Sequence, residues 1–522
     1  MKRRSCKNYL GFFIIIAILV FGFSVQQARA AEAVAGGCQR IMDLRVDGAE
    51  LISATIVPAG EDLPEYCRVT GYIRPSIHFE IRLPTNTWNE KFYMAGCGGY
   101  CGKVDANRPR FTNAPNYGLK RNYAVACTDS GHWGFAVFDG KWAYYDRQKE
   151  IDWGYRSIHE VTELAKKIIQ TYYGKAPQHS YFAGCSTGGR QAVMEALKYP
   201  KDFDGIISGA PALDYTGLVA TFFSWLVQAN RDAEGKHILD PSKVKLVSEA
   251  VYKQCDGKDG LEDGIIQDPR ECDFDPSSLL CCGTETENCL TAEEVTVLNK
   301  FYRGPKNSQG KQLYPGGLPY GSEPFWFLWV TGRGKGPGLI ELFNIDFLKY
   351  MAFETDPDSS DDPYNFNFDK DPSKLDFMAE IYNATDPNLE KFKENGGKLI
   401  MYQGWSDSIV TPFYTVDYYE KVVDEMGGLE KTTDFFRLFM VPGMDHCSIL
   451  PGKGPDRFDV LTALEHWVEK GKAPERIIAS QKEKDGTVVR TRPIYPYPQK
   501  TEYKGSGDVD DADSFTPKGK VE

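Results

Sequence analysis

The sequence predicts an α/β fold that one large insertion divides into two parts. In the first part of the chain, short apolar runs typical of buried strands alternate with a longer segment whose apolar residues have helical spacing. This alternation stops in the middle of the chain and resumes before the C-terminus. The mature chain of about 490 residues also exceeds one compact core, which favours a core with an inserted second domain.

The first 30 residues have the pattern of a signal peptide. A basic start, Met1-Lys2-Arg3-Arg4, precedes an apolar stretch from Leu10 to Val25 and the small-x-small cleavage pattern Ala28-Arg29-Ala30. An uncleaved membrane anchor is the alternative, but the apolar stretch is shorter than the roughly 20 residues that span a bilayer. We therefore expect residues 1–30 to be removed, leaving a secreted or periplasmic protein without a stable membrane anchor.

The charge of the chain argues against some classes of binding partner, and its cysteine count predicts disulfides. Removal of the signal peptide takes away five basic residues and no acidic one, so the formal net charge changes from −12 to about −17. We expect no nucleic-acid partner for so acidic a chain.

Cys6 leaves with the signal peptide, and the remaining twelve cysteines are an even number in an oxidising compartment, so we expect several disulfides. No Cys-x-x-Cys pair accompanies a second such pair or a histidine pair at zinc spacing, so a structural zinc site has little support.

The first part of the core is predicted over residues 31–212. Its expected elements, in order, are strands at 92–95 and 123–126, a helix at 158–173, a strand at 180–183, a sharp turn at Ser186, a helix at 191–199 and a strand at 205–209.

The inserted domain is predicted over residues 213–396. It holds five cysteines, an acidic run and the aromatic stretch Phe325-Trp326-Phe327-Leu328-Trp329. These aromatic residues could face a substrate, although packing the core of the insertion is their more usual role. The core resumes over residues 397–498, and residues 499–522 are rich in Lys, Asp and Gly, which predicts a mobile tail.

Ser186 is the candidate nucleophile. It is the centre of Gly184-Cys185-Ser186-Thr187-Gly188, between a predicted strand and a predicted helix, which is the context of a nucleophile elbow. Serine needs an imidazole to accept its proton and a carboxylate to hold that imidazole. Asp407 and His446 each follow a predicted strand, and the order serine, aspartate, histidine is that of α/β-hydrolases. His466, the other histidine after Asp407, lies in a helical pattern, so His446 is the predicted base.

A cysteine adjoins both the candidate nucleophile and the candidate base. If Cys185 and Cys447 form a disulfide, their Cα atoms lie within roughly 7 Å of each other. One step of about 3.8 Å along the chain on each side then keeps Ser186 and His446 within about 15 Å. Such a bond would assemble half of an active site.

A glycine-rich turn follows an earlier predicted strand, at Gly96-Cys97-Gly98-Gly99. Turns of this kind supply backbone N–H groups to a tetrahedral oxyanion, together with the residue after the nucleophile. We expect the N–H groups of Gly98 and Thr187 to be these donors, with Cys97 or Gly99 as the alternative to Gly98. An ordinary glycine turn is the competing interpretation.

An acidic stretch at residues 256–265, Asp-Gly-Lys-Asp-Gly-Leu-Glu-Asp-Gly-Ile, predicts a calcium loop. Its aspartates are three and then four residues apart, and its glycines allow backbone carbonyls to turn inward, so it offers the hard oxygen ligands that calcium prefers. The stretch loosely resembles the start of an EF-hand loop but lacks flanking helices, and Gln267 stands at the twelfth position. A solvated acidic turn with Asx hydrogen bonds is the alternative.

Other cysteine pairs are suggested by position. Cys255 and Cys272 would close the acidic loop and restrict the unfolded chain by roughly 3 kcal/mol. Cys281 with Cys289 and Cys38 with Cys67 are further plausible pairs. The sequence leaves the partners of four cysteines open: Cys97, Cys101, Cys127 and Cys282.

With Gly-Cys-Ser-Thr-Gly-Gly at 184–189, Asp407, and His446 followed by Cys447, the sequence resembles the tannase and feruloyl esterase family. The resemblance extends from Cys38 to about Pro496. Few other families pair the nucleophile and the base with cysteines. The segments that support it are 88–92, 128–132, 186–190 and 202–206.

The resemblance implies an α/β-hydrolase fold with a lid inserted after the nucleophile, a disulfide between Cys185 and Cys447 beneath the triad, and calcium bound in the lid. The chain departs from the family pattern at Cys97, Cys101 and Cys127, which lie near the predicted oxyanion turn. This departure affects what the resemblance implies about the geometry of the acyl pocket. The calcium ligands that the resemblance implies are the carboxylates of Asp256, Asp259 and Asp263 and the carbonyls of Leu261 and Ile265.

These observations predict a carboxylic ester hydrolase that cleaves small esters of aromatic acids, such as feruloyl, galloyl or related aryl esters, through a Ser-His-Asp triad and an acyl-enzyme. A polyester depolymerase, a terephthalate monoester hydrolase or a peptidase is the nearer alternative. A non-catalytic, calcium-stabilised binding protein is the alternative from another class, although no member of the triad is missing. The oligomeric state is left open.

Overall fold

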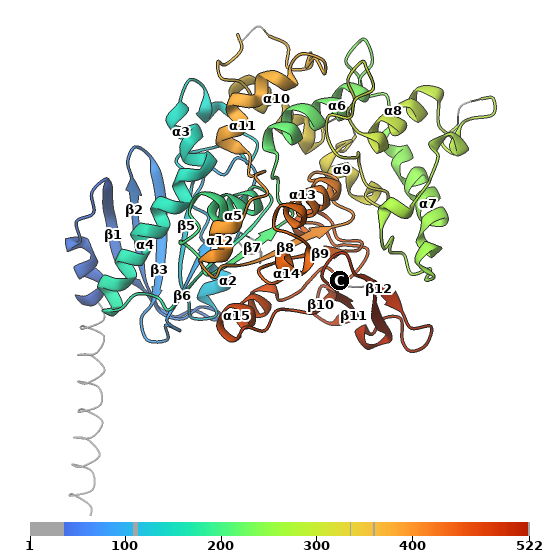
Figure 1. Cartoon of the computed structure of the whole chain (residues 1–522). Helices are drawn as coiled ribbons and strands as arrows, with labels where there is room; N and C mark the ends of the chain where they lie inside the picture. The colour runs from blue at the N-terminus through green and yellow to red at the C-terminus, as the bar shows by residue number, and fades with distance from the viewer. Residues whose placement is uncertain (1–35, 108–112, 285, 335, 359–360, 520–522) are drawn as a thin grey trace, which may run out of the picture.

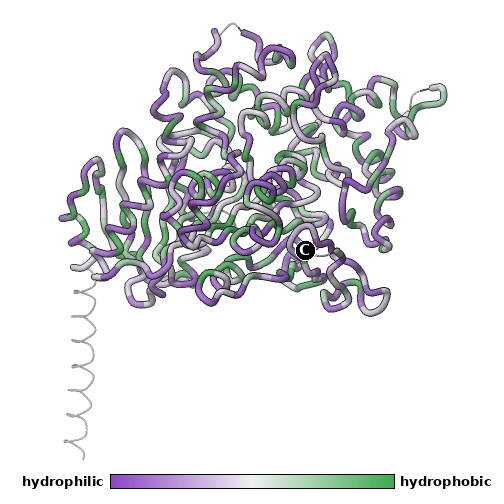
Figure 2. The backbone as a smooth tube through the Cα atoms, in the orientation of Figure 1, coloured by the Kyte–Doolittle hydropathy of each residue, from purple (hydrophilic) through white to green (hydrophobic). Residues whose placement is uncertain are grey.

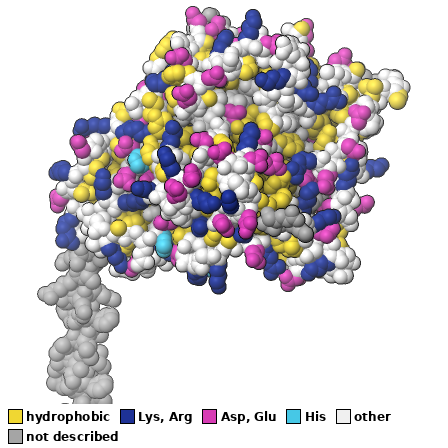
Figure 3. All heavy atoms as spheres, viewed as in Figure 1, with side chains coloured by type: hydrophobic (Ala, Val, Ile, Leu, Met, Phe, Trp, Pro, Cys, Tyr) yellow, Lys and Arg dark blue, Asp and Glu magenta, His cyan; other side chains and the backbone are white. Residues whose placement is uncertain are grey.

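The computed structural model describes residues 36–107, 113–284, 286–334, 336–358 and 361–519. The predicted signal peptide lies outside the described residues. No helix in these ranges is long and apolar enough to cross a membrane. On the face that Figure 3 shows, acidic and basic side chains are mixed over the surface.

A nine-stranded sheet forms the centre of the molecule, with the strand order β1-β2-β3-β5-β4-β6-β7-β8-β9. The strands from β5 to β9 in this order run parallel, whereas β1, β2 and β3 form an antiparallel edge. The bounds are β1 Ala49–Val57, β2 Tyr66–Ile73, β3 Ile77–Pro84, β4 Lys91–Ala95, β5 Ala124–Thr128, β6 His179–Cys185, β7 Gly205–Gly209, β8 Lys398–Gly404 and β9 Phe436–Val441.

Helices cover both faces of this sheet because its central strands carry apolar side chains on both sides. In β4, Phe92 and Met94 belong to one apolar core, and Tyr93, between them, belongs to the other. The first core is closed by α4, α5 and α13, and the second by α2 and α15 (Figure 1). Their bounds are α2 Pro115–Leu119, α4 Ser157–Tyr173, α5 Thr187–Lys198, α13 Pro412–Glu425 and α15 Val460–Lys470. The architecture confirms the predicted α/β class.

The segment between β7 and β8 leaves the sheet and forms a separate helical layer, which Figure 1 shows in green to orange above the central strands. It has its own apolar core, which also takes in Tyr100 and Trp153 from the first part of the chain. Apolar and polar stretches alternate along this layer (Figure 2). Its helices are α6 Phe223–Ala229, α7 Val244–Cys255, α8 Ala292–Arg303, α9 Trp326–Trp329, α10 Leu339–Tyr350 and α11 Asp376–Tyr382. The last helix before β8, α12 Glu390–Glu394, instead packs Phe392 into the core of the sheet beside α5.

Two further short helices complete the described part of the core, α3 Arg147–Ile151 and α14 Leu429–Thr433. Because β7 and β8 pair directly, the chain returns to the sheet beside the point at which it left. We refer to the segment between these two strands as the lid. The lid lies over the loops that follow the parallel strands, and these loops carry the candidate site residues.

The C-terminal segment departs from the prediction of a mobile tail over residues 499–522. Two small antiparallel sheets end the described chain, one of β10 Ile477–Lys482 with β11 Val488–Ile494, the other of β12 Lys500–Tyr503 with β13 Phe515–Lys518. Phe515 is buried, with the guanidinium of Arg492 4.0 Å from its ring centroid. Phe515 packs this segment against β11, a contact that the polar composition of the segment did not indicate.

Candidate active site

Ser186 lies at a sharp turn between β6 and α5. Its backbone has φ 66° and ψ −123°, a strained conformation for a residue with a side chain. A Cβ at Gly184 would collide with the backbone of Gly188, so the turn can close only with glycine there. The Ser186 amide donates to the carbonyl of Gly209 at 2.9 Å, which fixes the turn against β7. These are the features of a nucleophile elbow.

Asp407 and His446 meet in the loops after β8 and β9. The Nδ1 atom of His446 lies 2.7 Å from Oδ2 of Asp407, and both side chains are buried. The other carboxylate oxygen of Asp407 accepts from the amides of Ile409 and Val410, at 3.0 and 2.8 Å. Gln403 donates to Oδ2 at 3.0 Å. The carboxylate is therefore held on all sides, and the imidazole is oriented with Nε2 as its remaining polar atom.

A disulfide joins the two loops, between Cys185 and Cys447, with 6.0 Å between their Cα atoms. It links the residue before Ser186 to the residue after His446. The structure also forms the pairs Cys38–Cys67, Cys255–Cys272 and Cys281–Cys289. It adds a pair that the sequence left open, Cys97–Cys101, and leaves Cys127 and Cys282 as free thiols.

The turn after β4 faces Ser186. The amide of Cys97 donates to Oε1 of Gln191 at 3.2 Å, so it is occupied. The hydroxyl of Thr187 donates to the carbonyl of Gly99 at 2.7 Å and ties this turn to the start of α5. The amide of Thr187 is in the first turn of that helix, where N–H groups have no intrahelical partner. Gly98 remains available as a donor, and Cys97 does not.

These loops line a common cavity of about 280 Å³. The lid supplies much of its apolar wall, and among the described residues that line it there is no lysine, arginine, aspartate or glutamate. Ser186 and His446 both open into it, whereas Asp407 lies behind His446. The lining residues are Gly98, Gly99, Asn113, Val137, Ser186, Leu328, Trp329, Leu339, Phe343, Ile409, His446, Cys447 and Ile449.

One side chain near this cavity, Asp445, was missed by sequence reasoning. Asp445, fully buried, accepts a hydrogen bond at 2.9 Å from the indole of Trp329 in the lid. Burial, and then the charge of Asp407, raise the pKa of the Asp445 carboxyl to about 7. The adjacency of Asp445 to His446 was a visible signal, but its lid partner is 116 residues away in the sequence.

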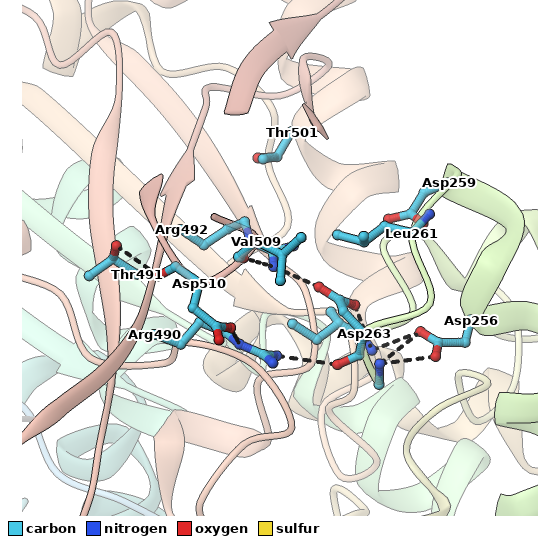
Figure 4. A network of polar contacts seen from close by, with 12 residues as sticks. Asp256, Asp259, Leu261, Asp263, Arg490, Thr491, Arg492, Thr501, Val509 and Asp510 are labelled. Atoms are coloured by element: carbon cyan, nitrogen blue, oxygen red, sulfur yellow. Dashed lines mark hydrogen bonds and ion pairs between the residues drawn. The ribbon is translucent and has the colours of Figure 1, made fainter. Parts of the chain in front are cut away.

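The acidic stretch of residues 256–265 belongs to the lid and lies beside β11, where Asp263 contacts Arg490 and Arg492 (Figure 4). Asp256 accepts from the amides of Gly264 and Ile265, each within 3.1 Å. Asp263 forms an ion pair with Arg492 at 2.6 Å. Among the described residues, no three acidic, histidine or cysteine side chains converge closely enough to hold a metal ion.

The donor chemistry of this stretch nevertheless fits a hard cation. Burial raises the pKa of Asp259 to about 6, with the nearby charge of Asp263 as a further cause. Burial also raises the pKa of Asp256, and Asp263 adds to that shift. Carboxylate and carbonyl oxygens of this kind are the ligands that calcium prefers.

Comparison with known proteins identifies the relatives of this chain. Residues 62–517 match the family model described as tannase and feruloyl esterase. The mono(2-hydroxyethyl) terephthalate hydrolase of Piscinibacter sakaiensis is 34% identical, over 87% of this chain and 85% of that protein. A probable feruloyl esterase of Arthroderma benhamiae is 31% identical, over 83% of this chain and 81% of that protein. The crystal structure of feruloyl esterase B from Aspergillus oryzae is 26% identical, with a TM-score of 0.82 over 93% of this chain and all of that one.

Proposed function

Because this chain belongs to the tannase and feruloyl esterase family of carboxylic ester hydrolases, we propose that it is a secreted serine esterase for small esters of aromatic acids. The observation that carries the proposal is the shared cavity of Ser186 and His446, with Asp407 bonded to the far side of the imidazole. The amino-terminal pattern that supports secretion is accompanied by five disulfides in the described chain.

In the proposed mechanism, Oγ of Ser186 attacks the ester carbonyl while Nε2 of His446 takes its proton. Asp407 holds the imidazole in the required tautomer and stabilises its charged form. The tetrahedral oxyanion accepts hydrogen bonds from the backbone amides of Gly98 and Thr187, with Gly99 as the alternative to Gly98. His446 then returns the proton to the leaving alcohol, and water releases the aromatic acid from the acyl-serine by the same steps.

The lining of the cavity supports an aromatic acyl group. Its lid wall is apolar and includes Trp329 and Phe343, whose rings can pack against a planar acyl group. A volume of about 280 Å³ is at the lower end of the range of ligand cavities, which suits one ring rather than an extended chain. We therefore place the aromatic acid in the cavity and the alcohol toward its mouth.

A second candidate is a terephthalate monoester hydrolase, which the 34% identical relative of that name favours. Terephthalate monoesters carry a second carboxylate on the ring. Among the described residues that line the cavity there is no lysine or arginine to pair with such a charge. Burying an unpaired carboxylate is costly, so neutral feruloyl and galloyl esters are the better candidates.

The test is a panel of feruloyl, galloyl, terephthalate and simple aryl esters, assayed with the wild type and with Ser186→Ala. Loss of the serine should lower turnover on the order of a millionfold. A fluorophosphonate probe should label the wild type and not Ser186→Ala. Unchanged hydrolysis by the variant would overturn the assignment, and an unlabelled, inactive wild type would favour a binding protein that has kept the fold.

We also propose that the stretch of residues 256–265 binds calcium as a structural ion of the lid. Its supports are the oxygen donors of the loop and the raised pKa values of Asp256 and Asp259. Calcium would supply positive charge there and would take no part in ester hydrolysis. The residues that would hold it are Asp256, Asp259 and Asp263 through their carboxylates, and Leu261 and Ile265 through their carbonyls.

A further inference from the structure

We propose that the Cys97–Cys101 disulfide is a positioning element of the oxyanion hole, fixing the turn that presents its backbone N–H groups to the reacting ester. The inference rests on the proposed function and concerns the same site. The two half-cystines enclose Gly98, Gly99 and Tyr100, and both of these glycines line the cavity that holds Ser186. The disulfide therefore closes the segment that carries the proposed N–H donors.

The turn is held in a conformation that is costly for an ordinary chain. Gly99, Cys101 and Gly102 all have left-handed backbones, with φ of 59°, 64° and 85°. Left-handed φ is natural for glycine but unfavourable for Cys101, which carries a Cβ. Such a residue persists only where its surroundings enforce the conformation. The disulfide from Cys101 to Cys97 is one such constraint.

Hydrogen bonds fix which way the peptide groups of the turn point. The carbonyl of Gly98 accepts from the amide of Cys101 at 3.0 Å, so it is directed into the turn. The C=O and N–H of a trans peptide point in opposite directions, which directs the N–H of Gly99 out of the turn. Among the hydrogen bonds of the described residues, neither the Gly98 nor the Gly99 amide is a donor. These two amides are available to an incoming oxyanion.

The outer side of the turn is also anchored, by Tyr100. Its amide donates to the carbonyl of Val137 at 2.7 Å, and its hydroxyl donates to the carbonyl of Phe343 at 2.7 Å. Phe343 belongs to α10 of the lid and lines the cavity. The turn is thus fixed to the core at its ends and to the lid at its tip. The disulfide is the only covalent constraint across it.

The short span of this disulfide argues for a local role. Cys97 and Cys101 are 4 residues apart, whereas the other four disulfides of the described chain span between 8 and 262 residues. Stabilisation through the unfolded chain increases with the length of the closed loop, so this bond contributes least to overall stability. Oxyanion donors, by contrast, must be held to within about 0.5 Å.

The test compares Cys97→Ala/Cys101→Ala with two matched controls. Cys281→Ala/Cys289→Ala removes the next shortest disulfide, which lies in the lid and outside the cavity lining. Cys127→Ala removes a buried free thiol that lines a small neighbouring cavity together with Cys97 and Cys101. For a feruloyl ester, the first variant should lose about 10- to 100-fold in kcat with KM within about twofold, because one misplaced donor can cost about 10²-fold or more. Both controls should keep kcat.

A transition-state readout separates positioning from general stability. An aryl boronic acid, which forms a tetrahedral adduct with the serine, should bind the first variant more weakly by the same factor as the loss in kcat/KM, and the free aromatic acid should bind equally to both proteins. The melting temperature should stay close to that of the wild type. An unchanged kcat, or an equal loss in the Cys281→Ala/Cys289→Ala control, would overturn the proposal.

If the double variant does not fold, graded reduction of the wild type gives the same answer. One equivalent of dithiothreitol converts the disulfide to two thiols and is itself oxidised to its cyclic disulfide. Loss of activity should follow the reduction of Cys97 and Cys101, as shown by peptide mapping of aliquots that are alkylated after reduction, and reoxidation of the unalkylated protein should restore it. Loss that follows reduction of Cys185 and Cys447 instead would contradict the proposal.

Failure of the proposed role of the Cys97–Cys101 disulfide can be distinguished from failure of the proposed esterase function. Retained activity in Ser186→Ala would overturn the serine mechanism itself. An inactive Ser186→Ala together with a fully active Cys97→Ala/Cys101→Ala would overturn only the role of the disulfide.

Discussion

The indole nitrogen of Trp329 lies 2.9 Å from Oδ1 of Asp445, the residue directly before His446. The ring of Trp329 also meets the ring of His446 edge to face, with 5.5 Å between their centroids. The other oxygen of Asp445 accepts from the amide of Leu450 at 3.2 Å. One buried carboxyl therefore connects α9 of the lid to the loop that carries the proposed base, and it sets the distance between lid and imidazole.

We predict that Trp329→Phe lowers kcat/KM for a feruloyl ester about tenfold, because it removes a hydrogen bond to a buried carboxyl while keeping a ring. Phenyl acetate, whose acyl group does not reach the lid, should be hydrolysed at nearly the wild-type rate. Asp445→Asn, which keeps an acceptor oxygen, should retain most activity on both esters. The measurement is steady-state kinetics with the two substrates.

The control for this prediction is Trp326→Phe, in the same helix. Trp326 is buried and donates to Ser322 at 2.9 Å, but it does not line the cavity. A loss that is equal for the feruloyl and acetyl esters, or equal in Trp326→Phe, would show that Trp329 acts on overall stability.

We predict that the lid loses stability as the pH rises through neutrality, because of Glu323. Burial raises the pKa of this carboxyl to about 7, and it accepts from the hydroxyl of Tyr302 and the amide of Gly321, both at 2.9 Å. Between about pH 4.5 and 7 the folded protein keeps this proton and the unfolded chain does not. The contribution to the free energy of unfolding is therefore complete at low pH and lost above pH 7.

Thermal unfolding between pH 5 and pH 9 measures this effect. Glu323→Gln should flatten the pH dependence of the melting temperature, since the amide carries no charge at any of these pH values. Glu293→Gln, at an exposed position in α8, should leave the dependence as in the wild type. Parallel curves for wild type and Glu323→Gln would contradict the prediction.

We predict that calcium stabilises the protein and that its removal lowers the melting temperature. A ligand that binds only the folded state at a hundred times its Kd adds about 2.7 kcal/mol to the free energy of unfolding. Asp259→Asn should weaken calcium binding in calorimetry and reduce the thermal shift. The control is Asp43→Asn, at an exposed position distant from this loop in the sequence, which should change neither quantity. An absence of both binding heat and thermal shift in the wild type would rule out the metal site.

We predict that Cys185→Ala/Cys447→Ala is both less stable and less active than the wild type. The bond closes a loop of 262 residues, so its loss should lower the free energy of unfolding by about 2–5 kcal/mol. It should also loosen the spacing of Ser186 and His446 and lower kcat. Denaturant unfolding and steady-state kinetics test the two effects, and a variant with wild-type kcat would show that packing alone holds the two loops together.

Much of the core and of the candidate site could be predicted from the sequence. Local features carried this information: the apolar run of each strand, the glycines around Ser186, and the polar residue after β8 and after β9. A parallel sheet brings the ends of successive strands to one edge, so Ser186, Asp407 and His446 could be predicted to lie near one another without any knowledge of distances. The predicted family is confirmed by the match over residues 62–517.

Contacts between distant segments were decided only by the tertiary structure. The hydrogen bond from Trp329 to Asp445 and the ion pair of Arg492 with Asp263 join parts of the chain with no shared pattern. The partner of Cys97 was equally open, because several pairings of four cysteines are compatible with one sequence. The physical reason is that periodicity and turn chemistry report the conformation of neighbouring residues, whereas these contacts depend on how the lid and the C-terminal strands pack against the core.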